Sequence, residues 1–74
     1  MNDKRRKRIS EVVARLESCS TDLESIKDEE DETRDNIPEN LQSGDRYCES
    51  EECSDKIDDA ISDIRSAIDG LGEI

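Results

Sequence analysis

The sequence has very few of the side chains that build an ordinary hydrophobic core. It contains no Trp, Phe or His, a single aromatic residue, Tyr47, and only 30% apolar residues. No apolar run reaches the length of a membrane span or of a signal-peptide core. With 74 residues, these absences indicate one small domain, residues 1–74, which we expect to be soluble, intracellular and outside the membrane.

The missing histidine and the spacing of the cysteines argue against a metal site. Cys48 and Cys53 are five residues apart, which places them on different faces of a helix, and Cys19 is about thirty residues away. Zinc sites normally begin with a more closely spaced pair of ligands. We therefore expect reduced thiols, no metal and no cofactor. Carboxylates are abundant, but nothing in the sequence builds a desolvated pocket around them, so we expect no enzyme activity.

Charged residues make up 45% of the chain and are unevenly distributed. The run KRRKR, within a basic head of residues 1–8, carries five of the eleven basic residues. From residue 9 onward, 6 basic residues stand against 21 acidic ones, a local net charge of −15. Such a body repels phosphate backbones, so we expect the head to be a solvated helix start rather than a direct nucleic-acid or lipid contact.

Two segments have apolar positions in alternating steps of three and four, the seam of a heptad repeat. The first segment has Ile9, Val12, Leu16, Cys19, Leu23 and Ile26. The second has Ile57, Ile61, Ile64, Ile68 and Leu71, and the small polar Ser54 occupies the preceding position of the same spacing. These patterns predict helices over about 3–35 and 46–71. The stretch NIPENLQSGD, residues 36–45, contains Pro38 and Gly44 and predicts the loop between them.

Two seams of similar length on either side of a short loop predict an all-α fold, an antiparallel helical hairpin. In such a pair the numbers of facing residues add to a constant, and a sum of 80 matches the two seams layer by layer. The predicted pairs run from Ile9 with Leu71 to Ile26 with Ser54, and continue to Glu30 with Ser50. Homodimeric pairing of the first helix alone, which aligns Ile9 with Ile26, is an alternative that leaves the second seam unused.

A second apolar row beside the main seam indicates self-association. It repeats every seven residues in the second helix, and Val13 widens the stripe of the first. A stripe of this width is typical of helical bundles. We therefore predict a homo-oligomer, dimer or higher, most simply two hairpins that form a four-helix bundle. The expected interface residues are Val13, Cys53, Ala60, Ala67 and Ile74.

The acidic surface is the feature that most directly suggests a function. Carboxylates spaced along a rigid helix can imitate a row of phosphates and compete for a basic nucleic-acid channel. We expect them to bind a protein partner with a basic surface. The candidate partner-binding residues are Asp28, Glu29, Asp31, Glu32, Asp55, Asp58, Asp59 and Asp63.

The run IPENLQSGDRYCESEE, followed by a helix rich in Asp, Ile and Ala, carries a resemblance. It resembles small acidic helical-hairpin proteins of uncharacterised function from bacterial and bacteriophage genomes, and the similarity covers residues 37–74. The two cysteines and the glycine in this run depart from that pattern. The resemblance implies a small accessory protein, phage-encoded and acting in the cytoplasm of a bacterial host cell, and it implies no catalytic residue.

Three functional hypotheses follow from these features. The first is a non-enzymatic acidic interaction protein, a phage-encoded inhibitor that engages a basic, nucleic-acid-binding surface of a host protein or defence system. The second is a structural or adaptor coiled coil whose charge serves solubility. The third is an oligomer that sequesters an anionic nucleotide at the basic head.

Overall fold

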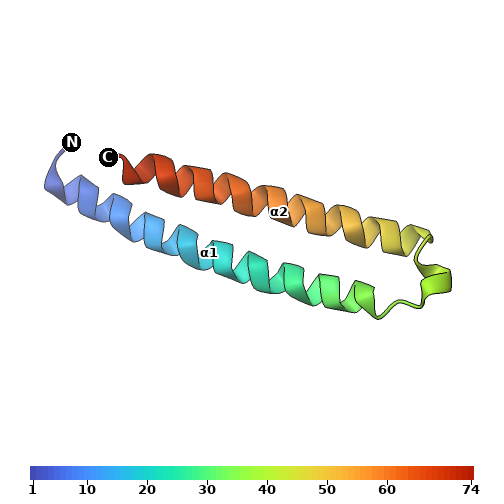
Figure 1. Ribbon diagram of the computed structural model, residues 1–74. Helices are drawn as coiled ribbons and strands as arrows, with labels where there is room; N and C mark the ends of the chain where they lie inside the picture. Colours follow the sequence, from blue (N-terminus) through green and yellow to red (C-terminus); the bar gives the residue numbers. More distant parts are fainter.

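The computed structural model describes all 74 residues as two antiparallel helices that lie side by side, with both termini at one end (Figure 1). Helix α1 spans Asp3–Asp35 and helix α2 spans Asp45–Gly72, joined by a loop that contains the short 3-10 helix η1, Glu39–Leu41. There are no strands. The molecule is a rod of 59 × 15 × 12 Å. The predicted all-α hairpin is confirmed, and the helix boundaries differ from the expected ones by at most one residue.

Local signals in the sequence explain where the helices begin and end. Asn2 caps α1, because its side-chain oxygen accepts a hydrogen bond of 2.9 Å from the backbone N–H of Arg5. The chain leaves α1 just before Pro38, which disfavours a helical conformation for the residue that precedes it. Gly44 precedes α2, and a Cβ atom there would lie 3.2 Å from the carbonyl oxygen of Leu41. The glycine therefore permits a tight entry into α2.

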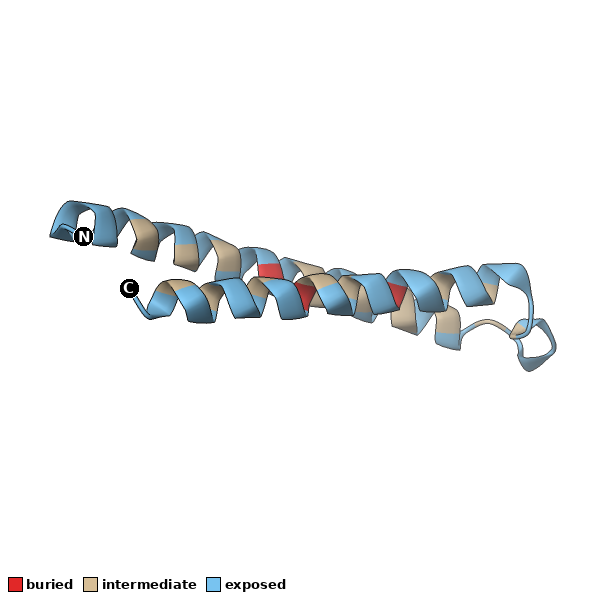
Figure 2. Ribbon diagram, turned by 90° about the horizontal axis from the view of Figure 1, so that it is seen from above, coloured by how far each residue is buried: buried red, intermediate tan, exposed pale blue.

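The seam of α2 lies where the sequence predicts it, against α1 (Figure 2). Its buried and half-buried positions include Tyr47, Ser50, Ser54, Ile57, Ile61, Ile64, Ile68 and Leu71. Only Ile61 among the apolar residues is buried, with 7% of its surface exposed. The interface between the helices is consequently thin.

The seam of α1 matches the predicted one at Ile9, Leu16 and Leu23, but each alternate position is shifted by one residue, so the helix is rotated about its axis from the predicted orientation. The covered positions include Ile9, Val13, Leu16, Ser20, Leu23, Lys27, Glu30 and Arg34. Val12, Cys19 and Ile26, which the sequence predicts at the seam, are exposed instead. The rotation exchanges Ile26 for Lys27 at the interface, where the Lys27 ammonium reaches carboxylates of both helices. Polar contacts made by residues of α1, and not the apolar pattern alone, therefore set its orientation.

The pairing of the helices is also displaced from the predicted register. The expected pair of Glu30 with Ser50 is present as a hydrogen bond of 2.7 Å. Ser54, however, was expected opposite Ile26 and instead bonds to Asp31 and Arg34. The other polar contacts between the helices join residues whose numbers add to between 84 and 89. Helix α2 therefore lies about one turn closer to the loop end of α1 than a sum of 80 would place it.

The rotated seam can be tested at two serines that flank Cys19. If Cys19 faced α2, Ser18 and Ser20 would flank the interface and be exposed to a similar extent. In the structure Ser20 is only 6% exposed, whereas Ser18 lies on the outside. Ser20→Asp should lower the free energy of unfolding by about 2 kcal/mol or more, because it buries a charge, whereas Ser18→Asp should change it by less than about 0.5 kcal/mol. Urea unfolding followed by far-UV circular dichroism measures both. Equal effects would place Cys19 at the seam.

Candidate interaction surfaces and an interhelical polar network

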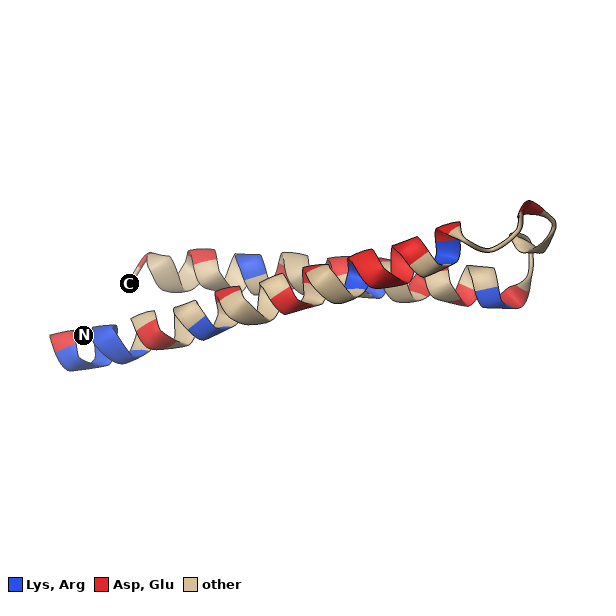
Figure 3. Ribbon diagram, turned by 90° about the horizontal axis from the view of Figure 1, so that it is seen from below, with Lys and Arg blue, Asp and Glu red and all other residues tan.

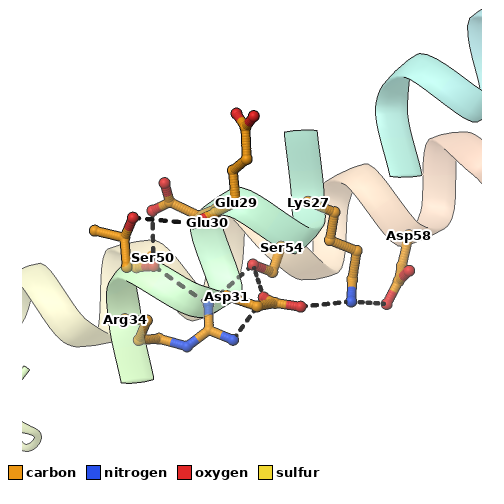
Figure 4. A network of polar contacts seen from close by, with 9 residues as sticks. Lys27, Glu29, Glu30, Asp31, Arg34, Ser50, Ser54 and Asp58 are labelled. Carbon is orange, nitrogen blue, oxygen red and sulfur yellow. Dashed lines mark hydrogen bonds and ion pairs between the residues drawn. The ribbon is translucent and has the colours of Figure 1, made fainter. Parts of the chain in front are cut away.

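Asp31 joins the two helices in the half of the hairpin nearest the loop (Figure 4). Its carboxylate accepts hydrogen bonds from Arg34 at 2.7 Å, from the Ser54 hydroxyl at 2.7 Å and from the Lys27 ammonium at 2.9 Å. Lys27 and Arg34 lie on α1 with Asp31, and Ser54 lies on α2. Both oxygens of this carboxylate accept hydrogen bonds from within the hairpin, so Asp31 is engaged in structural contacts.

Further contacts extend this network along α2. Arg34 also donates to Ser50 at 3.2 Å and to Ser54 at 2.9 Å, and Ser50 in turn donates to Glu30 at 2.7 Å. On the other side, Lys27 lies 3.6 Å from a carboxylate oxygen of Asp58. No buried side-chain nitrogen or oxygen lacks a hydrogen-bond partner. The network is internally complete, and it replaces the apolar layers that α1 lacks beyond Leu23.

The same contacts set the ionisation of the network. The hydrogen bond from Ser54, followed by those from Lys27 and Arg34, holds the pKa of Asp31 well below its usual range. The hydrogen bond to Asp31 raises the pKa of Lys27 in turn. Both groups are therefore charged at neutral pH. A carboxylate in this state is a poor general acid or base near pH 7. The network is therefore suited to holding the two helices together.

The candidate partner-binding residues do not form one face. Asp31 and Asp58 belong to the network, and Asp28 lines a shallow groove beside Asp58 and Arg65. The remaining candidates are exposed and make no ion pair within the chain: Glu29, Glu32, Asp55, Asp59 and Asp63. Acidic residues are spread over both helices toward the loop (Figure 3). The surface is an acidic sleeve around the loop-proximal half, residues 28–59, rather than a single stripe.

The ion pairs of the chain leave most acidic side chains of this acidic sleeve unpaired. Only four of the 22 acidic side chains take part in ion pairs within the chain. Two of the basic residues, Lys27 and Arg34, lie in the interface, where 23% and 14% of their side chains are exposed. Their charge is directed toward Asp31 instead of the surface. Exposed carboxylates therefore dominate the outside of the loop-proximal half.

The expected oligomer residues fall into two groups. Val13 is half-buried beside Leu71 in the interface between α1 and α2, so it packs within the hairpin and not against a second copy. Cys53, Ala67 and Ile74 are exposed, and Ala60 is half-buried. The formation of an oligomer stays a prediction.

Neither helix is sufficiently long and apolar to cross a membrane.

The basic head borders a shallow depression on α1. Its lining includes Arg5, Arg8 and Arg15 around the apolar side chains of Ile9 and Val12. This arginine-lined hollow is open and lies on one helix. The three cysteines are exposed and unpaired.

Sequence reasoning missed the roles of Lys27 and Arg34 as interface residues. The signal is present, because these two residues are seven apart and continue the series of Val13 and Ser20 at the same spacing. A lysine and an arginine at seam positions are costly unless partners satisfy them. The serines that do so, Ser50 and Ser54, are small polar residues in the opposite seam, and together the two sets predict a polar half of the interface.

The role of Asp31 can be tested by its pH dependence. Its folded-state pKa is depressed, so its contribution to stability is present above the unfolded value of about 3.9 and is lost as pH falls below it. Asp31→Asn should therefore destabilise the hairpin at pH 7, and its difference from wild type should shrink as pH approaches 3. Thermal unfolding between pH 7 and 3 measures this difference. Glu32→Gln, on an exposed and unpaired position of the same helix, is the control. A constant difference across this range would exclude a structural role for the Asp31 charge.

Three comparisons with known proteins were made, and no protein-family model, curated protein or solved structure matches this chain.

Proposed function

We propose that this protein is a non-enzymatic, phage-encoded inhibitor whose acidic sleeve occupies a basic, nucleic-acid-binding surface of a host protein, such as a nucleic-acid-processing or defence enzyme. The observation that carries the proposal is the charge of the sleeve. Residues 28–59 contain 14 acidic and 3 basic side chains, and one of the basic ones, Arg34, is directed into the interface. A basic channel is the complementary surface for such an exterior.

The charge density of the sleeve is close to that of a nucleic acid. Residues 45–59 of α2 rise by about 1.5 Å each and so extend for about 22 Å, alongside the end of α1. The net charge of residues 28–59 over this length is about one negative charge every 2 Å. Duplex DNA carries one per about 1.7 Å. A channel that binds phosphates by their spacing would meet a similar potential on this rod.

The way in which the charges are held also supports this function. The helices present most of the carboxylates on regular backbone, and the Asp31 network fixes the two helices against each other in the same half of the molecule. A backbone that is already ordered loses little freedom on binding. A rigid acidic rod can therefore compete with a nucleic acid for a surface that is itself preformed.

A neutralised variant tests the acidic sleeve. Asp28→Asn, Glu32→Gln, Asp55→Asn and Asp59→Asn change four exposed carboxylates that make no ion pair in the chain. The combined variant should keep its helicity, because it relieves repulsion between like charges. We expect it to retain about tenfold less of the nucleic-acid-binding proteins of a bacterial lysate than wild type at low salt, measured by affinity capture and mass spectrometry.

A matched control carries four neutralised carboxylates at the other end of the rod. These are Glu11→Gln, Glu17→Gln, Asp69→Asn and Glu73→Gln, all exposed and unpaired. This control should capture as well as wild type, and both should release their partners at high salt and on addition of duplex DNA. Capture that resists salt and DNA, and is equal in all three proteins, would reject the inhibitor and favour the adaptor hypothesis. Thermal stabilisation by free nucleotides would favour sequestration instead.

A further inference from the structure

The rotation of α1 leaves an apolar stripe on the outside of the hairpin. Val12, Cys19 and Ile26 repeat every seven residues along α1, and all three are exposed, Val12 to 39% and Ile26 to 51%. Each lies one residue before a position that faces α2. A heptad spacing of apolar residues is the pattern that packs against another helix. Within the hairpin this stripe has no helix to pack against.

The second helix contributes a parallel stripe on the same side. Cys53, Ala60 and Ala67 also repeat every seven residues, each one residue before a seam position of α2. Glu24 and Arg65 each lie four residues after a seam position, and they form an ion pair with each other. This pair lies on the opposite side of the hairpin. In an antiparallel helix pair, positions of the same kind on the two helices flank the same side of the seam. The two apolar stripes therefore form one face, with polar groups on the other.

The charges beside the α1 stripe are arranged so that they complement themselves. Arg8 and Arg15 border its first half, and Asp22 and Glu29 border its second half, again at intervals of seven residues. If a second copy of α1 packs on the stripe in the antiparallel direction, Arg15 meets Asp22 of the second copy. Arg8 likewise meets Glu29 of that copy. A two-fold axis repeats each of these contacts, as in an isologous dimer.

We infer that the Val12, Cys19 and Ile26 stripe binds a second copy of this chain, with α1 antiparallel to α1 and a two-fold axis at Cys19. Val12 then packs against Ile26 of the second copy, and the two Cys19 side chains face each other. Ala67 lies at the level of Cys19, because the neighbouring Ser20 and Ile68 line the same surface depression. Its small side chain permits the close approach of the second hairpin.

Charge distinguishes this arrangement from the other symmetric one, in which α1 packs on α2 of the second copy. That alternative has one attractive pair, Glu29 with Lys56, and sets Asp22 against Asp63 at the same level. It leaves Arg15 without an acidic neighbour. When α1 pairs with α1, every charged contact along the stripe is attractive. Repulsion between like charges therefore disfavours the alternative and not this arrangement.

This dimer does not depend on the acidic-sleeve proposal, and it differs from the predicted oligomer interface in the residues that α1 contributes. The axis at Cys19 lies at the middle of α1, Asp3–Asp35, so the two hairpins overlap along this helix and their loops lie at opposite ends of the dimer. The interface uses Val12, Cys19 and Ile26 where the sequence predicted Val13. Val13 is not available to a second copy because it lies against α2 near Leu71.

Sedimentation analysis of the full chain tests the inference. Wild type should have twice the 8.4 kDa mass of the chain at micromolar concentration. Arg15→Glu should raise the dissociation constant of the dimer by about tenfold or more, because it sets like charges against each other. The swapped variant Arg15→Glu with Asp22→Arg should return it to within about threefold of wild type. Arg46→Glu, an equal change of charge on an exposed position near the loop, should leave it unchanged.

Cross-linking locates the axis independently. In a chain with Cys48→Ser and Cys53→Ser, a short bis-maleimide should join two chains through Cys19. A chain with Cys19→Ser and Cys48→Ser should give no such product, because the two Cys53 side chains lie far from the axis. A wild-type monomer at 100 µM, or a dimer that neither Arg15→Glu nor the swap affects and that does not cross-link at Cys19, would overturn the inference.

Discussion

The carboxylate of Asp31 is the constraint on which the arrangement of the two helices depends. It holds Lys27 and Arg34 of its own helix and Ser54 of the other, at distances of 2.7 to 2.9 Å. Both cations can reach this carboxylate and α2 only if they lie in the interface. Their position turns α1 about its axis, moves Val13 and Ser20 inward, and leaves Val12, Cys19 and Ile26 outside. The exposed apolar stripe is therefore a consequence of the polar network.

The division of the interface into two halves has an energetic meaning. Toward the termini the contacts involve aliphatic side chains, and toward the loop they are hydrogen bonds and ion pairs. A satisfied polar network adds little net stability over apolar packing, but an incomplete one is strongly unfavourable. The network therefore contributes more to choosing one alignment of the helices than to holding them together. Aliphatic contacts, with only Ile61 buried among apolar residues, supply the rest.

The sequence predicts the two helices, the loop and the α2 seam, because each depends on signals within a few residues. Pro38 and Gly44 mark the break, and the isoleucines of α2 have one consistent spacing. The orientation of α1 is not predictable in this way, since two series one residue apart, that of Val12 and that of Val13, fit a helix almost equally. The choice between them is made by hydrogen bonds to Ser50 and Ser54, 16 and 20 residues beyond Arg34 in the chain. The acidic candidates were identified from composition, but Asp31 and Asp58 could be assigned to the polar network only from their contacts with Ser54 and Lys27.

The polar half of the interface lies next to the loop and the aliphatic half lies at the termini. Different forces therefore oppose separation of the helices at the two ends of the rod. Near the loop, the short connection keeps the helices together, so weak and salt-sensitive contacts are sufficient there. At the free ends nothing but side-chain packing joins the helices, and that is where the aliphatic residues lie. A rise in ionic strength therefore loosens the connected end and leaves the open end closed. The hairpin is consequently protected against fraying at its termini in conditions that weaken its charges.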